Sequence, residues 1–314
     1  MSQAAVVVPV DPPKTKTIRS VRARALPGVR GSIAVSWAFL GLLVVIPVSA
    51  LIWVVVRAPL DRIGEVLSAP RTLAAYGLSL GASLIAALVS LPIGLAIAWV
   101  LTRYELPGRR VLDALVDLPF AMPTAVSGIA LTALYSENGL LGAWLMPLGI
   151  EVAFHRSGIV MALIFTSLPF VVRTVQPVIE SFPREVEEAA LSLGATRSET
   201  FFRVIFPALR PALAAGGILA FARALGEYGS VVFISGNMPM KTEITPLLVM
   251  TKLDQFDYAG ATALALVMLV ASFAILIAIN GLTWRRRGRT IPTLRRRSPQ
   301  PPTMQPPAEM LVAP

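Results

Sequence analysis

The sequence predicts an all-α integral membrane protein with six transmembrane helices and one cytoplasmic helical hairpin. Of its 314 residues, 55% are hydrophobic and only 15% are charged, a balance far from that of soluble domains. The apolar residues gather in six runs, each long enough at about 1.5 Å per residue to cross a hydrocarbon core of about 30 Å. A polar segment between the fourth and fifth runs carries helix start and stop signals, which predict the hairpin.

The six runs lie within residues 33–284, the predicted transmembrane domain. The first run is longer than the apolar region of a signal peptide, about 7–15 residues, and is expected to remain in the mature protein. Pro119 and Pro123 in the third run and Pro169 in the fourth require neighbouring groups that satisfy the freed backbone. The expected spans are Ile33–Val56, Tyr76–Leu101, Leu118–Tyr135, Ile159–Val175, Ala208–Ile234 and Ala259–Leu282.

Two basic terminal segments, residues 1–32 and 285–314, flank this domain. The first is rich in Pro, Lys and Arg and has no apolar periodicity, and the second is rich in Arg and Pro. Such composition predicts disordered tails that carry no fold. The clustered arginines of the C-terminal tail favour a position near anionic membrane lipid.

The basic residues also predict the orientation of the chain. The tails, the hairpin and the loops on their side of the membrane hold 21 of the 28 Lys and Arg residues, the opposite side holds 6, and Arg223 lies inside a span. Loops rich in Lys and Arg remain in the cytoplasm, so both termini and the hairpin are expected there. The net charge of +10 therefore reports topology and does not indicate a nucleic-acid partner.

The predicted hairpin covers residues 181–207. Pro183 supplies a helix start, and Val186, Ala189, Ala190 and Leu193 form one apolar stripe at helical spacing. Gly194 has the position of a glycine that ends a helix, and Thr196 with Glu199 has the form of a capping box, so a second short helix is expected to run toward Pro207. A hairpin this small cannot bury its stripe alone and is expected to dock on another protein.

Several kinds of chemistry are excluded by composition. The chain has no cysteine and one histidine, His155, which excludes disulfides and iron–sulfur clusters and argues against a histidine-rich metal site. A P-loop requires a Gly-Lys pair, and the chain contains none. No catalytic residue, metal or cofactor is expected, and any ATP hydrolysis must come from a partner subunit.

Polar groups inside the spans are candidates for a substrate pathway or gate. Arg223 and Glu227 lie four residues apart on one face of the fifth run, which fits either a structural ion pair or a role in an anion pathway. Thr124 and Ser127 follow the prolines of the third run. Their hydroxyl or backbone groups could donate to an anion, or the hydroxyls could bond to their own helix backbone.

The hairpin resembles the EAA loop of permease subunits of ABC importers. The resemblance rests on Glu188-Ala189-Ala190, Gly194, and Val204-Ile205-Phe206-Pro207, where the family usually reads I-x-L-P. It implies the type I ABC importer permease fold and a loop that inserts into a groove of the ATP-hydrolysing subunit. The implied coupling residues are Glu187, Glu188, Ala189, Ala190, Gly194 and Pro207. The alternative is an ordinary cytosolic connection between two spans.

From about Tyr76 to Trp284 the chain resembles the T-type (also called U-type) permease subunit of the sulfate/thiosulfate branch. Residues 119–128, 236–243 and 252–262 carry this resemblance, whereas Arg-Ala-Leu-Gly-Glu at 223–227 is shared with molybdate permeases, so another oxyanion is the alternative. The resemblance implies a bacterial plasma-membrane importer. Its implied partners are a homologous W-type permease subunit, two ATP-binding subunits and an extracytoplasmic sulfate-binding protein.

Two other functional classes fit the sequence less well. An ion-coupled secondary transporter needs buried carboxylates, but Glu227 is the only acid deep in a predicted span and has Arg223 beside it. A membrane-tethered nucleic-acid binder could use the basic tails, but it would need neither six spans nor an acidic hairpin.

Overall fold

The computed structural model describes residues 29–287, so the two predicted tails lie almost wholly outside the described range. The chain divides into two compact units, residues 1–53 and 54–314. The described part of the first unit comprises α1 (Val29–Leu40), the π-helical turn η1 (Gly41–Val45) and most of α2 (Ile46–Arg57). These elements form one continuous helix that contains the first predicted span.

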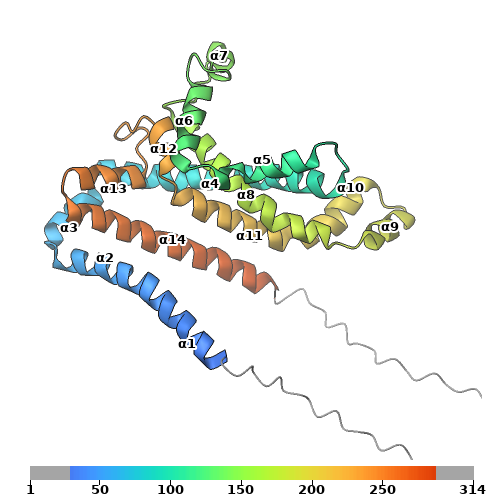
Figure 1. Ribbon diagram of the computed structural model, residues 1–314, viewed down its shortest axis with the longest axis horizontal. Helices are drawn as coiled ribbons and strands as arrows, with labels where there is room; N and C mark the ends of the chain where they lie inside the picture. Colours follow the sequence, from blue (N-terminus) through green and yellow to red (C-terminus); the bar gives the residue numbers. More distant parts are fainter. Residues whose placement is uncertain (1–28, 288–314) are drawn as a thin grey trace, which may run out of the picture. The chain divides into compact units, whose positions relative to one another are not determined.

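The described part of the second unit is also built only from helical elements (Figure 1). Its longest helices are rich in apolar residues, and its short helices lie in the connections. The elements are α3 (Leu60–Ser68), α4 (Pro70–Arg103), α5 (Arg109–Ala121), α6 (Thr124–Tyr135), α7 (Gly142–Leu145), η2 (Met146–Leu148), α8 (Arg156–Glu180), α9 (Arg184–Ser192), α10 (Arg197–Thr200), η3 (Phe201–Ile205), α11 (Phe206–Leu225), α12 (Gly229–Ile234), α13 (Thr245–Asp254) and α14 (Tyr258–Arg287).

Among the described residues, five helices are long and apolar enough to cross a membrane, and the pair α5–α6 makes a sixth span if its halves are counted together. The predicted all-α fold with six apolar segments is therefore confirmed. The third predicted segment, Leu118–Tyr135, is not one continuous helix. Its helix ends at Ala121 and α6 begins at Thr124, with a bend of 113° between them. Pro123 causes the break, because it disfavours helical geometry at Met122, which adopts an extended conformation instead.

The fifth predicted segment, Ala208–Ile234, also breaks. Helix α11 ends at Leu225, and a separate short helix, α12, starts at Gly229. Unlike the third segment, this one contains no proline at the break. The buried side chain of Glu227 lies between the two helices and bonds to the start of α12, as described below.

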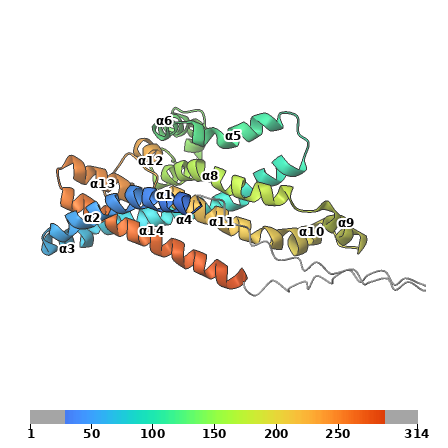
Figure 2. The same cartoon turned by 60° about the horizontal axis from the view of Figure 1, so that its bottom comes forward.

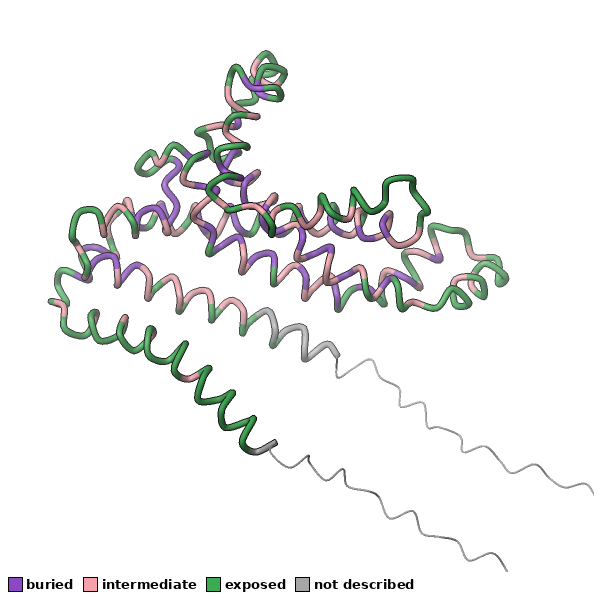
Figure 3. Tube along the Cα trace, viewed as in Figure 1, coloured by how far each residue is buried: buried purple, intermediate pink, exposed green. Residues whose placement is uncertain are grey.

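Helices α4, α8 and α11 pack side by side and form the centre of the second unit (Figures 1 and 2). They approach closely because the buried face of α4 carries mainly small residues, from Ser79 through Ala86 and Ser90 to Ala98. At Gly94 an added Cβ would lie 2.7 Å from a methyl group of Val171, so only glycine fits there. Buried positions follow these three helices along their length, whereas the connections are mostly exposed (Figure 3).

The two ends of this bundle differ. The α9–α10 hairpin lies at one end, and α3 with α13 lies at the other (Figures 1 and 2). At the α13 end, Asp257 pairs with Arg62 and Lys252 and accepts a hydrogen bond from the Gly260 N–H at the start of α14. Burial raises the pKa of Asp257, but these bonds and charges outweigh burial and hold the pKa below its ordinary value.

Candidate functional sites: a helical hairpin and a broken span

The hairpin forms where the sequence predicts it. Helix α9 starts after Pro183 and ends in a Schellman motif, in which the Gly194 N–H donates to Leu191 O at 2.9 Å and the Ala195 N–H donates to Ala190 O at 3.1 Å. Gly194 has φ +87°, a conformation that favours glycine. The capping box of Thr196 and Glu199 then starts α10. Both local predictions are confirmed.

The second helix of the hairpin differs from the prediction at its far end. It does not stop near Pro207 but continues through the π-helical turn η3 directly into α11, so residues 197–225 form one helix. Pro207 lies inside this continuous helix, directly after the π-helical turn η3, and its missing N–H leaves one backbone carbonyl without its usual helix bond. The hairpin is therefore joined to the bundle helix α11 without a flexible linker.

The apolar stripe of α9 is uncovered. Val186 is 42% exposed and Leu193 is 88% exposed, Ala189 is exposed, and only Ala190 is partly covered. No residue of α9 is buried. A helix of nine residues gains little stability from its own backbone bonds, so an uncovered stripe indicates a docking surface for a partner.

The acids of α9 have different environments. Glu188 is exposed to solvent. Glu187 is less exposed, because its carboxylate forms an ion pair with Arg103 at the end of α4, and its side chain is 23% exposed. Glu187 lies off the apolar stripe, but that side of α9 faces α4.

In the broken fifth span, Arg223 and Glu227 form the ion pair that the sequence allowed. Arg223 Nη1 lies 2.5 Å from Glu227 Oε2, and the two side chains are 31% and 2% exposed. The other carboxylate oxygen, Oε1, accepts both the Ser230 N–H and the Ser230 hydroxyl at 2.9 Å. Glu227 thus links the end of α11 to the first turn of α12.

Helix α6 packs against the same turn of α12. An added Cβ on Gly128 would lie 2.4 Å from Ser230 O, and one on Gly229 would lie 2.1 Å from the Thr124 hydroxyl oxygen, so both positions need glycine. Thr124 is the first residue of α6, where backbone N–H groups lack partners within the helix. The buried Ser127 hydroxyl donates to Pro123 O at 3.4 Å and so bonds to its own helix.

The first turns of α6 and α12 therefore meet beside the Arg223–Glu227 pair. All four predicted pathway residues, Thr124, Ser127, Arg223 and Glu227, belong to this region. Arg223 is the most accessible charge there, and helix N-termini favour negative charge. The geometry can attract an anion weakly, because Glu227 already neutralises much of the arginine charge.

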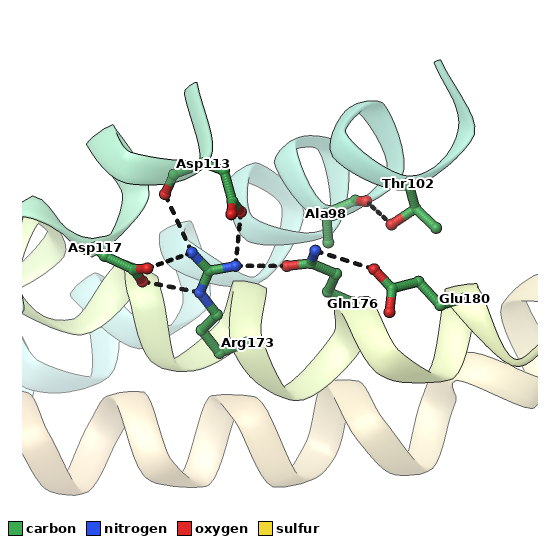
Figure 4. A network of polar contacts seen from close by, with 7 residues as sticks. All are labelled: Ala98, Thr102, Asp113, Asp117, Arg173, Gln176 and Glu180. Atoms are coloured by element: carbon green, nitrogen blue, oxygen red, sulfur yellow. Dashed lines mark hydrogen bonds and ion pairs between the residues drawn. The ribbon is translucent and has the colours of Figure 1, made fainter. Parts of the chain in front are cut away.

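Sequence reasoning missed a second ionic cluster, in which Arg173 of α8 holds α5 (Figure 4). The guanidinium binds both carboxylate oxygens of Asp117 at 2.8 and 2.6 Å, Asp113 at 2.7 Å, and Gln176 Oε1 at 2.8 Å. Gln176 in turn donates to Glu180 at 3.1 Å. No residue of α5 is fully buried, and besides this cluster α5 is attached by the edge-to-face contact of Phe120 with Phe170 and by Val116, which packs against the core.

Replacing Arg173 by methionine is expected to release α5. Hydrogen bonds to charged groups contribute about 1.5–3 kcal/mol each, so the backbone amides of α5 should exchange hydrogen at least about tenfold faster, while those of α4 and α8 keep their protection. Hydrogen exchange of the purified protein measures this directly. Arg110→Met, which changes an exposed arginine on α5 itself, serves as the control. Unchanged protection in Arg173→Met would mean that the apolar contacts of Val116 and Phe120 hold α5 without the ionic cluster.

The position of each missed residue explains why it was missed. Asp113 and Asp117 share one face of α5, but only the fold brings them to Arg173, about 60 residues away in the chain. Arg103 follows an apolar run, and in the sequence it indicates only which side of the membrane the loop lies on. Its pairing with Glu187, 84 residues later, has no local signal.

The sequence is similar to that of a known family of membrane transport proteins. Residues 90–287 match the sequence model of the family described as "Binding-protein-dependent transport system inner membrane component". The chain is 47% identical to the "Sulfate transport system permease protein CysT" of Escherichia coli, over 85% of this chain and 97% of that protein. It is 48% identical to the protein of the same name from Synechococcus elongatus, over 80% and 91% of the two chains.

A third relative is equally similar. The "Probable sulfate transport system permease protein cysT" of Nephroselmis olivacea is 48% identical over 78% of this chain and 89% of that protein. Among solved structures, two of a bacterial ABC transporter for the polysaccharide alginate align with TM-scores of 0.68 and 0.69 at 16% identity. Each covers 82% of this chain and 94% of the other, which confirms the predicted permease fold.

Proposed function

Because the chain belongs to the family of binding-protein-dependent transport system inner membrane components, we propose that it is the permease subunit of an ATP-driven sulfate or thiosulfate importer. Three relatives at 47–48% identity carry sulfate transport in their names, which supports the substrate. The uncovered stripe of α9 supports a coupling role for the hairpin, because an exposed apolar surface on a helix this short needs a partner. That partner is the ATP-hydrolysing subunit.

The complete importer contains a homologous W-type permease subunit, two ATP-binding subunits and an extracytoplasmic sulfate-binding protein. The chain lies in the bacterial plasma membrane with both termini and the hairpin in the cytoplasm, as the distribution of Lys and Arg supports. Residues 33–284 form the permease domain between two basic tails. The hairpin residues Glu188, Ala189, Ala190 and Gly194 contact the ATPase, whereas Glu187 and Pro207 hold the hairpin to the bundle.

The anion passes the junction of α6, α11 and α12. Arg223 and the first turn of α6 at Thr124 attract the anion, while Glu227 neutralises part of the arginine charge. Ser127 contributes mainly through close packing, since its hydroxyl bonds to Pro123 O. A weak site suits a transported dianion, because tight binding would slow its release.

Molybdate or another oxyanion is the alternative substrate, since the pathway residues at 223–227 occur in both branches. An ion-coupled transporter fits less well, because both carboxylate oxygens of Glu227 are already bonded, one to Arg223 and the other to Ser230.

A purified complex tests the proposal. The tagged chain is expressed with its partner subunits, the proteins that co-purify are identified, and the complex is placed in vesicles with sulfate-loaded binding protein. Uptake of labelled sulfate should require ATP, stop with vanadate and exceed molybdate uptake, whereas the chain alone should not hydrolyse ATP. Uptake driven by a proton or sodium gradient without ATP would contradict the proposal, and preferential molybdate uptake would change the substrate.

A further inference from the structure

The last turns of α4 contact both legs of the hairpin. Arg103 forms the ion pair with Glu187 in α9, and its guanidinium carbon lies 5.5 Å from the centre of the Trp99 ring. Trp99 in turn makes an edge-to-face contact with Phe201 in η3, with ring centres 5.4 Å apart and planes at 86°. One leg of the hairpin is thus held by a charge and the other by an aromatic ring.

The Arg103–Glu187 ion pair is largely shielded from solvent. The Arg103 side chain is 12% exposed, and its Nε is buried without a hydrogen-bond partner, so Glu187 and the Trp99 ring supply its main stabilisation. Partly buried charge pairs are weakened less by salt and water than surface pairs. Because α9 buries none of its residues, the pair is a principal attachment of this helix.

The opposite end of α4 is bonded to the segment that leads into α13. Arg71 donates two hydrogen bonds of 2.7 Å to the fully buried carboxylate of Glu243. The Ser79 hydroxyl accepts the Thr245 N–H at 2.7 Å and donates to the Thr245 hydroxyl at 3.0 Å. Glu243 and Thr245 belong to the segment that leads into α13. Helix α4 extends over 34 residues, about 51 Å at the standard rise, and stays helical through Pro92, so it joins the hairpin to this segment.

We propose that α4 transmits the movement of the hairpin, and that Arg103 is the positioning residue that fixes Glu187 and hence α9 to this helix. The inference rests on the proposed function and adds the route by which movement of the hairpin reaches the other end of the bundle. When the ATPase displaces the hairpin, α4 moves with it and shifts the Glu243 segment at the far end. Continuity of η3 with α11 connects one leg of the hairpin to α11. The Arg103–Glu187 pair connects the other leg, α9, directly to α4.

Exchanging the charges tests this pairing in the complete importer in vesicles. Arg103→Ala and Glu187→Gln should each lower sulfate uptake and the sulfate imported per ATP about tenfold, a typical size for a coupling between sites, with the ATPase still attached. The exchange variant Arg103→Glu with Glu187→Arg should recover uptake to within about threefold of the original protein. Glu185→Gln, an exposed acid of the same helix, should change neither quantity.

A cross-link gives an independent measurement, because the chain has no cysteine of its own. The variant with Arg103→Cys and Glu187→Cys should transport poorly until a short bis-maleimide joins the two positions, and then recover. Thermal unfolding of the variant before and after joining, measured beside uptake, distinguishes restored coupling from general stabilisation by the cross-link. Normal uptake per ATP in Arg103→Ala, or failure of both the exchange and the cross-link to restore uptake, would overturn the inference.

The outcome for Gly194→Val separates this inference from the proposed function. If Gly194→Val and Glu188→Ala both transport normally, the hairpin is only a connector, so its proposed coupling to the ATPase and the transmission through α4 both fail, while ATP-driven sulfate uptake itself stands. If Gly194→Val fails while Arg103→Ala keeps normal uptake per ATP, the proposed function stands, and transmission through α4 is wrong.

Discussion

Replacing Gly194 by valine is expected to reduce sulfate uptake by up to about 100-fold, the upper range of a coupling between two sites, while the protein reaches the membrane in near-normal amount. Gly194 has φ +87°, which a β-branched residue resists. No atom lies within 4 Å of an added Cβ, so the strain comes from the backbone and not from crowding. Relief of that strain breaks the Schellman motif and redirects α9 and its docking stripe.

Transport assays of the complete importer measure this effect, together with retention of the ATPase and the response of ATP hydrolysis to loaded binding protein. Gly149→Val is the matched control, because Gly149 has φ +72° and an equally open environment but ends η2, far from the hairpin in sequence. It should carry a similar stability cost with uptake within about twofold. Glu188→Ala should show a milder form of the Gly194→Val defect. Normal uptake in both hairpin variants would leave the hairpin as a simple connector.

Removing Arg223 is expected to destabilise the protein by about 3–5 kcal/mol, because it leaves the buried Glu227 carboxylate without its counter-charge. The environments are unequal, since Glu227 is 2% exposed and Arg223 is 31% exposed. Glu227→Gln should therefore cost less than Arg223→Ala. A glutamine oxygen can still accept the two bonds from Ser230, and the arginine left behind can reach solvent.

The double variant Arg223→Ala with Glu227→Gln separates stability from transport. It leaves no buried charge at the α11–α12 junction, so the thermal unfolding temperature and the assembly of the complex should return close to those of the original protein. If Arg223 attracts the anion, this assembled variant should still transport at least about tenfold more slowly, since a positioned charge contributes a few kcal/mol. Normal uptake by the double variant would remove Arg223 from the pathway and leave a structural ion pair.

Much of this protein could be predicted from short-range patterns in the sequence. Hydrophobic runs, proline positions and capping residues act within a few residues, because helix backbone bonds join positions four apart. For this reason the apolar segments and the helix signals at Pro183, Gly194 and Thr196 could be predicted. The family resemblance in the hairpin rests on the same kind of local pattern.

The tertiary structure alone decided which side chains meet and where the spans break. Periodicity places Glu187 off the apolar stripe of α9, and only packing shows that α4 lies against that side. Pro123 marks a break, but the 113° bend depends on how α5 and α6 pack against α8 and α12. Arg173 meets Asp113 and Asp117 for the same reason. Contacts between residues 56–84 positions apart arise from helix packing, a long-range property without a signal in any local window.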